Sequence, residues 1–287
     1  MWWLAALLFA LLTGGALGET IRIATWNLQW FPAGTTRAVP SEVEAANIKG
    51  AADVLKLANP DVLMIQEVRD WETCQRLAAA LLPEKYEVII CSAFRDEFSG
   101  GIGRQQVAIL AKRSAEVAWA ERWKSSGRVD PPRGFAFALI RFGNTELGFY
   151  SLHLKSNLVF SGGEKAVQMN IRKREVSAEQ LLFHQRDLGR TYPSLNKWIV
   201  AGDFNTNRDQ ELFVSEATLG TFEKAGFSDP LARRPLSERV THPGSGKYPD
   251  ATFDYVLAKG LRAVATPEII KSSVSDHFLV VVEVETQ

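Results

Sequence analysis

The sequence is poor in cysteine and has no net charge, and each absence narrows the possible functions. Only two of its 287 residues are cysteines, Cys74 and Cys91, and neither lies in a Cys-x-x-Cys or cysteine/histidine pattern. Because such patterns hold structural zinc, we do not expect a zinc-stabilised module. Lysine plus arginine and aspartate plus glutamate each number 33. The chain thus lacks the positive excess that often marks a sequence-independent nucleic-acid binder, so any contact with a polyanion must come from local basic clusters.

The amino terminus also lacks charge. Residues 1–16 are almost entirely apolar, and the first charged residue is Glu19. This run, which ends in small residues, is typical of a secretory signal peptide covering residues 1–18, although Lys or Arg is missing from its start. This run is short for a bilayer span, which takes ~20 apolar residues. An uncleaved membrane anchor is therefore only the alternative interpretation. We expect export to the periplasm or the extracellular space, without stable membrane insertion of the mature chain.

The mature chain, residues 19–287, is expected to form one domain. With 46% hydrophobic residues it can bury one large core, and no internal repeat suggests a second unit. We expect a monomer and find no sign of a protein partner. In an oxidising compartment the two cysteines can form a disulfide, whereas in the cytosol they would stay reduced. Because the sequence does not reveal their Cα separation, both states remain open.

Apolar segments rich in β-branched and aromatic residues recur along the whole chain and predict strands. They cover residues 21–26, 62–66, 86–90, 107–111, 116–119, 135–142, 147–154, 198–201, 252–257 and 279–284. Helical spacing of apolar residues predicts helices at 41–58, 72–82 and 164–188, the first opened by a capping box from Ser41 to Glu44. Hairpin-like runs favour antiparallel pairing, while residues 21–66 look like a crossover. The fold class that accommodates both is α/β, with two mixed β-sheets packed face to face and flanked by helices, a four-layer α/β sandwich.

Polar side chains stand at or just beyond the ends of these strands. The set is Asn27, Glu67, His153, Asp203, Asn205, Asp254, Asp276 and His277. Side chains at strand ends are held rigidly and can converge from distant parts of a chain, as a phosphate-cleaving metal site requires. Glu67 follows a buried apolar stretch, where a carboxylate needs a partner; it suits Mg²⁺ or Mn²⁺, or else forms a salt bridge with a base such as Arg69.

The remaining members of this set suit proton transfer and phosphate contact. Asp203 and Asn205 stand two residues apart and would point the same way if the strand continued, so that they could orient a water, although Gly-Asp-Phe-Asn is also a turn sequence. His153 and His277 could act as bases or stabilise charge, with Asp254 orienting an imidazole. A histidine beside a strand is also commonly structural, and we interpret His184 and His242 in that way.

Taken together, these motifs resemble the endonuclease/exonuclease/phosphatase superfamily, which includes pancreatic deoxyribonuclease, apurinic endonucleases, neutral sphingomyelinases and inositol polyphosphate phosphatases. The resemblance extends over residues 21–284 in the expected order. It implies that Glu67 is the main metal ligand, that Asn27 contacts metal-bound water or phosphate, and that Asp276 completes the metal-side carboxylates. It further implies that His153 touches the scissile phosphate.

The resemblance also assigns the residues nearest the attacking water. Asp203 would orient or deprotonate that water, Asn205 would hold a phosphate oxygen, and Asp254 would orient His277. Arg133 stands about where deoxyribonuclease-like members place a phosphate-binding arginine. One departure concerns the acid that orients the first histidine in those members. The corresponding residues here, 90–93, include no acid, and Asp96 or Glu97 could take its place from the next loop.

The expected function is therefore that of an exported phosphodiesterase that depends on Mg²⁺ or Mn²⁺ and acts by direct attack of water. Nucleic acid is the preferred substrate, because basic residues flank the site loops; the run Arg172, Lys173 and Arg174 is the densest. Such clusters are also common on solvated surfaces. The alternatives are a lipid or inositol phosphate hydrolase, with a small apolar loop at residues 158–160, and an inactive binding protein on the same fold.

Overall fold

The computed structural model describes residues 18–96, 99–159, 161–246 and 248–286. The predicted signal peptide, except for residue 18, lies outside the described residues. Glu97 lies outside them as well. Among the described residues, no helix is long and apolar enough to cross a membrane.

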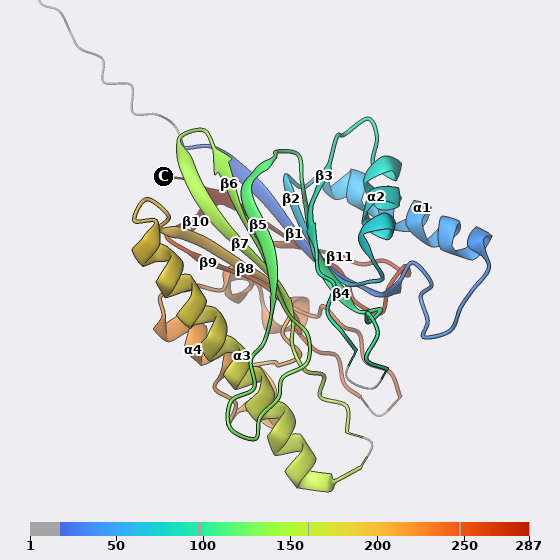
Figure 1. Ribbon diagram of the computed structural model, residues 1–287, viewed down its shortest axis with the longest axis vertical. Helices are drawn as coiled ribbons and strands as arrows, with labels where there is room; N and C mark the ends of the chain where they lie inside the picture. Colours follow the sequence, from blue (N-terminus) through green and yellow to red (C-terminus); the bar gives the residue numbers. More distant parts are fainter. Residues whose placement is uncertain (1–17, 97–98, 160, 247, 287) are drawn as a thin grey trace, which may run out of the picture.

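Two mixed β-sheets form the centre of the molecule (Figure 1). The first has the strand order β10-β12-β1-β2-β4-β3, with β11 paired to β12, and the second has the order β5-β6-β7-β8-β9. The first sheet contains β1 (Thr20–Phe31), β2 (Val62–Val68), β3 (Glu87–Cys91), β4 (Gln106–Ala111), β10 (Arg262–Ala263), β11 (Glu268–Ile270) and β12 (Leu279–Glu285). The second contains β5 (Ala115–Arg122), β6 (Gly134–Phe142), β7 (Thr145–His153), β8 (Lys197–Asp203) and β9 (Asp254–Lys259). One neighbouring pair in each sheet is parallel, β1 with β2 and β7 with β8.

Helices cover the outer faces of both sheets, which gives four layers (Figure 1). Helices α1 (Ser41–Ala58) and α2 (Trp71–Ala80) lie against the first sheet, and α3 (Gly163–Thr191) and α4 (Thr218–Lys224) against the second. Alternation along the strands separates the two cores: Ile23 and Met64 face the second sheet, whereas Ala24 and Leu63 face α1 and α2. This period of two is what lets one strand serve both layers. The predicted fold class is confirmed.

The local predictions hold for the long elements and fail at several ends. α1 has the predicted bounds, but its N-cap is Pro40 without a side-chain cap, and Ser41 bonds Glu42 instead of closing a capping box. α2 begins one residue early because Asp70 caps it, accepting from the Thr73 N–H at 2.8 Å. β10, β11 and α4 were not predicted, since each is short. Both cysteines are free thiols in this structure.

Candidate active site

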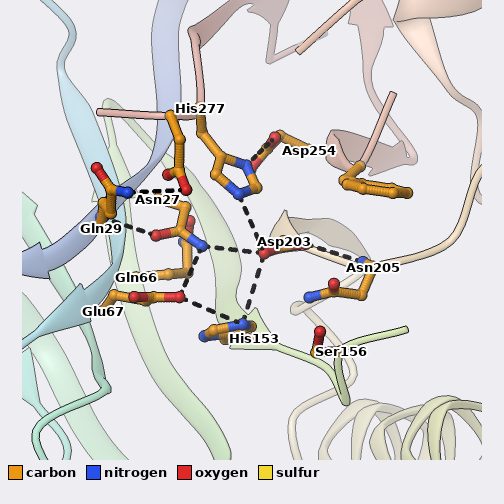
Figure 2. Close-up of polar contacts among 12 residues, drawn as sticks. Asn27, Gln29, Gln66, Glu67, His153, Ser156, Asp203, Asn205, Asp254 and His277 are labelled. Carbon is orange, nitrogen blue, oxygen red and sulfur yellow. Dashed lines mark hydrogen bonds and ion pairs between the residues drawn. The ribbon is translucent and has the colours of Figure 1, made fainter. Parts of the chain in front are cut away.

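Sheet register brings the polar strand ends together in space. On β7, β8 and β9, His153, Asp203 and Asp254 are direct cross-strand neighbours. On the facing sheet, Asn27 of β1 pairs with Gln66 of β2, which sets Glu67 beside Asn27. Figure 2 shows these side chains converging from the two sheets. Residues far apart in the sequence thus form one cluster because parallel and antiparallel pairing aligns their strand ends.

The half of the site on the first sheet is built around Asn27. Its Nδ2 donates to Asp203 Oδ2 at 3.0 Å and to Glu67 Oε1 at 3.3 Å, and its Oδ1 accepts from the Gln29 N–H at 3.0 Å. Glu67 has a left-handed backbone with φ 59°, and its Oε2 accepts from the Trp30 N–H at 2.9 Å. Neutral N–H donors therefore hold the Glu67 carboxylate, and the salt bridge to Arg69 is not formed; Arg69 pairs with Glu44 and Asp70.

The turn that carries Asp276 and His277 is fastened to β1. Ser275 Oγ donates to the Asn27 carbonyl at 2.7 Å, and the Trp26 indole donates to the His277 carbonyl at 2.9 Å. Asp276 is exposed, and its Oδ2 accepts from Gln29 Nε2 at 3.0 Å. Consequently the final motif of the chain is positioned by its first strand, and Asp276 is hydrogen-bonded to Gln29, two residues from Asn27 on that strand.

Asp203 occupies the centre of the buried half. Its Oδ2 lies 3.5 Å from His153 Nε2 and 3.8 Å from His277 Nε2, and its Oδ1 accepts from the Asn205 N–H at 2.8 Å. Burial raises the pKa of Asp203 to about 7, against the opposing charge of His277. A carboxylate with such a pKa can take a proton from water near neutral pH.

The two imidazoles differ in charge because their surroundings differ. Burial alone would lower the pKa of His277, but the carboxylates of Asp254 and Asp203 outweigh it and raise that pKa to about 10. Asp254 Oδ2 lies 2.8 Å from His277 Nδ1 and fixes the ring. Burial lowers the pKa of His153 well below its ordinary value, helped by the positive charges of Arg133 and His277. His277 is therefore cationic and His153 neutral near pH 7.

No acid orients His153 among the described residues. Its Nδ1 is buried and has no hydrogen-bond partner there. Asp96 instead accepts from the Ser99 N–H at 2.8 Å within its own loop, so the predicted substitution by Asp96 is not seen. What holds His153 is the backbone behind it, where Arg133 donates to the carbonyls of His153 at 3.0 Å and Leu154 at 2.6 Å.

Asn205 lies beyond the end of β8, so the condition under which it would point the same way as Asp203 is not met. Asn205 has a left-handed backbone with φ 51°, and its Nδ2 donates to the Leu154 carbonyl at 3.4 Å. Gly202 is required for a different reason from the expected turn: a Cβ built there would lie 1.9 Å from the Leu152 carbonyl oxygen on β7. The Gly-Asp-Phe-Asn segment thus combines close strand packing with a left-handed exit.

A buried polar contact joins the two sheets directly beneath the site. Gln66 Nε2 donates to Thr25 Oγ1 at 3.1 Å and to Ser151 Oγ at 3.3 Å, and all three residues are fully buried. Thr25 precedes Asn27 by two residues, Gln66 precedes Glu67, and Ser151 precedes His153 by two. Buried polar groups that satisfy one another fix a unique arrangement. This contact therefore sets the spacing between the two halves of the site.

The residues predicted to bind phosphate do not form one continuous basic surface. Arg172 is exposed and pairs with Glu175 at 3.2 Å and Glu179 at 3.0 Å on its own helix, and Lys173 is half-buried. Arg174 is 1% exposed and forms a two-point salt bridge with the buried Glu216, while its Nη1 donates to the Lys155 carbonyl. Arg174 therefore holds α3 onto the loop after β7 and is not available to a polyanion.

Arg133 is partly committed as well, since it donates to the backbone around His153 and to Gln105 Oε1 at 3.3 Å. Its positive charge nevertheless lies close enough to lower the pKa of His153, as does that of Lys155. Of these two cations, only Arg133 was singled out from the sequence.

The oxygen donors of the site fit a hard divalent cation. Asp203, Asp254 and His277 have ligand-type atoms within 4.8 Å of one another, but a protonated His277 has no lone pair for a metal, so the carboxylates are the donors that remain. Asp254 Oδ1 is buried without a hydrogen-bond partner among the described residues. Glu67 and Asp276 add carboxylates on the more open side. Because carboxylate oxygens dominate and no thiolate is near, the donor set suits Mg²⁺ or Mn²⁺ and not a soft metal.

Several contributing residues had no role assigned from the sequence. Gln66 and Ser275 belong to the motifs Gln66-Glu67 and Ser275-Asp276-His277, so their position next to a candidate ligand was the available signal. Gln29 gave none. His242, interpreted as structural, lies in the loop before β9 with its ring centroid 4.7 Å from that of His277; nothing in a long loop predicts that contact.

Residues 24–277 match the family model described as the endonuclease/exonuclease/phosphatase family. A search of curated proteins gave no match.

Solved structures match over almost the whole chain at low identity. An endonuclease/exonuclease/phosphatase family protein from Leptotrichia buccalis is 19% identical, with a TM-score of 0.65, covering 92% of this chain and 99% of that one. A family protein from Bacteroides thetaiotaomicron is 16% identical, with a TM-score of 0.64 and coverage of 94% and 96%. TDP2 from Caenorhabditis elegans is 15% identical, with a TM-score of 0.62 and coverage of 93% and 74%. At such identities these structures establish the shared fold alone.

Proposed function

Because the chain belongs to the endonuclease/exonuclease/phosphatase family, we propose that it is a divalent-metal-dependent phosphodiesterase that hydrolyses nucleic acid by direct attack of water. One observation carries the proposal: buried Asp203 lies 3.5 Å from neutral His153 and 3.8 Å from cationic His277. A base, a hydrogen-bond donor and a fixed positive charge thus meet at one point. Hydrolysis without a covalent intermediate needs those three groups.

Asp203 is the base in this proposal. Its Oδ2 faces both imidazoles, while its Oδ1 is occupied by the Asn205 N–H. The pKa of about 7 makes the carboxylate basic enough to accept a proton from water at neutral pH. Asn27, which donates to the same Oδ2, keeps that oxygen in place.

The two histidines act on the phosphoryl oxygens. His277, held cationic by Asp254, stabilises negative charge that develops in the transition state, and its Nε2 faces inward. His153 is neutral and presents Nε2 toward Asp203 and Glu67. It supplies a hydrogen bond, with its position set by the backbone contacts of Arg133.

Glu67 and Asp276, with the amide of Asn27 between them, are the groups that would hold the divalent cation. A bound Mg²⁺ or Mn²⁺ supplies charge neutralisation and Lewis acidity at the phosphate. Glu67 is suited to this because neutral N–H groups of Asn27 and Trp30 donate to it and its side chain keeps 12% exposure.

The choice of nucleic acid is supported by the charges of Arg133 and Lys155 beside His153. The Arg172 and Arg174 salt bridges remove part of the original support for it. A lipid or inositol phosphate is the competing substrate, since Leu158, in the loop that leaves the site, is 48% exposed. An apolar residue in that place could contact a lipid surface.

A substrate panel tests the proposal. The purified protein is assayed with single- and double-stranded DNA, RNA, sphingomyelin vesicles, inositol phosphates and a chromogenic phosphodiester, with Mg²⁺, with Mn²⁺ and after chelation. We expect metal-dependent cleavage of DNA or RNA. Turnover of a lipid or inositol phosphate alone would replace the substrate, and no turnover of any phosphoester with either metal would overturn the enzyme proposal in favour of a binding protein.

Export is a separate proposal, supported by the apolar, uncharged residues 1–16 and the small residues that follow. Expression with the complete leader should give a product outside the cytoplasm whose amino terminus is Glu19. A cytoplasmic product that retains Met1 would contradict it.

A further inference from the structure

The fold brings the two cysteines of the chain into the same apolar cluster. Cys74 lies in the first turn of α2 and is fully buried, whereas Cys91 is the last residue of β3 and is half-buried. Figure 1 shows α2 packed beside β3 on the outer face of the first sheet. Cys91 lies close enough to raise the pKa of the Cys74 thiol, and it is a larger cause of that shift than burial. Since there are only two cysteines in 287 residues, their proximity is a specific feature of the structure.

The surroundings of the two thiols favour a covalent bond between them over metal binding or catalysis. Both pack into the apolar cluster that contains Leu77 and Ala108. Cys91 Sγ also lies 3.6 Å from the Ser92 carbonyl, to which it donates. Among the described residues, the one acidic and histidine group that could hold a metal consists of Asp203, Asp254 and His277, without either thiol. The thiols therefore have each other as their chemical partner.

We propose that Cys74 and Cys91 form an intramolecular disulfide that ties α2 to the end of β3. The chemistry is thiol–disulfide exchange with a low-molecular-weight disulfide or a disulfide oxidoreductase as oxidant. The more accessible Cys91, as thiolate, attacks the oxidant's disulfide and releases one thiolate. The Cys74 thiol then loses its proton and attacks the Cys91 sulfur of the mixed disulfide, releasing the second thiolate. Two protons and two electrons leave the protein, and the oxidant is reduced to two thiols.

This order of attack follows from burial. The nearby Cys91 and burial raise the pKa of the Cys74 thiol, so Cys74 is the poorer first nucleophile. The bond would close a loop between residues 74 and 91, which restricts the unfolded chain and stabilises the folded one. α2 begins shortly after Glu67 in the chain. The disulfide would therefore hold this helix next to the metal side of the site. In the exported protein proposed above, the oxidised pair is the expected state.

The proposal is tested by mass spectrometry on the folded protein. The protein is incubated with glutathione disulfide, quenched with acid, unfolded and treated with N-ethylmaleimide. We expect no maleimide on the chain, an intact mass lower by two hydrogens, and, after trypsin without reductant, a cross-linked pair of peptides covering residues 70–76 and 86–95. The variants Cys74→Ala and Cys91→Ala are matched controls, because each keeps one thiol that cannot form this bond.

A thermal measurement on the wild type, with Cys91→Ala as its control, accompanies it. Reduction of the oxidised wild type should lower Tm by about 5 °C or more, whereas the Tm of Cys91→Ala should not respond to reductant. Two maleimides on the folded, glutathione-treated wild type would overturn the proposal. Glutathione retained on Cys91 with a free Cys74, or a disulfide-linked dimer, would overturn it as well. None of these results depends on the proposed phosphodiesterase activity.

Discussion

The two halves of the site are built on different physical terms. On β1 and β2, Asn27 and Glu67 are held by neutral amide donors, and the Glu67 side chain remains 12% exposed. In the other half, Asp203 at the end of β8 and His277 in the turn before β12 are buried together, with side chains 2% and 8% exposed, and the pKa of each is displaced. The first half can exchange a cation with solvent, and the second is suited to hold and move protons.

This difference explains why the site needs side chains from both sheets. A buried carboxylate beside a cation is costly unless the geometry around it is complete. The Asp254 contact with His277 and the inter-sheet contact of Gln66 complete it here. An open carboxylate such as Glu67 needs less support but gives little control over protons. Changes on one half should therefore alter proton-dependent chemistry, and changes on the other should alter metal dependence.

The largest effect is expected at Asp203. Asp203→Asn keeps the shape but removes the base, so kcat on a chromogenic phosphodiester should fall by on the order of 10³-fold, within the range of general base catalysis. Asp229→Asn is the matched control, because burial also raises the pKa of Asp229 although it lies outside the cluster. Equal activity of Asp203→Asn and wild type would remove Asp203 from the mechanism.

The histidines come next. His153→Gln and His277→Gln should each lower kcat by about 10²-fold, while circular dichroism and Tm remain close to wild type. His184→Gln provides the contrast, since His184 lies 2.8 Å from the Tyr150 hydroxyl away from the site; stability should fall there and kcat should not. If the losses of activity and stability matched in all three variants, the imidazoles would be structural.

Proton control can be separated from metal binding by pH. The raised pKa of Asp203, about 7, means that the base form predominates above that pH, so kcat/KM should fall as the pH drops through about 7. A bound cation would move this limb to lower pH. A profile that is flat between pH 5 and about 9 would argue against Asp203 as base.

A smaller effect is expected for Asp254→Asn, which removes a charge and keeps a hydrogen-bonding side chain. Without that charge the pKa of His277 should fall from about 10, which NMR titration of the imidazole can measure, and kcat should fall by roughly 10-fold. The stability of the fold also depends on the charge of His277. Because its pKa is raised in the folded state, the charged form stabilises the fold fully below pH about 6.5, and this contribution is lost as the pH rises through about 10. An unchanged His277 titration would refute the orienting role.

The smallest effect on activity is expected on α3. Arg172 is paired with Glu175 and Glu179, so Arg172→Gln should leave kcat and the salt dependence of DNA binding unchanged. Arg174→Gln breaks a buried pair with Glu216 and should cost ~3–5 kcal/mol of stability in urea unfolding. A salt slope that flattens on changing Arg172 would restore the nucleic-acid contact predicted for this basic run from the sequence.

How much of this could be predicted from the sequence depends on the range of each interaction. Strand-end placement identified Glu67, Asp203 and His277, because local alternation of apolar residues fixes where a strand ends. The Gln66 contact beneath the site and the Arg174 pair with Glu216 could not be predicted, since both depend on which distant segments pack together. Arg172 and Arg174 look equivalent in the sequence, and only the rotation of α3 makes one exposed and the other buried.

The most direct test of the account is the metal requirement of Glu67→Gln compared with wild type, measured as the Mg²⁺ or Mn²⁺ concentration that gives half-maximal hydrolysis of a chromogenic phosphodiester. The account predicts that this concentration rises by about 100-fold or more, since loss of even a residue behind a metal ligand typically costs 10–100-fold. It also predicts that the His277 titration, which reports the buried half, stays as in wild type. An unchanged metal requirement with full activity in Glu67→Gln would contradict the division of the site into a metal half and a proton half.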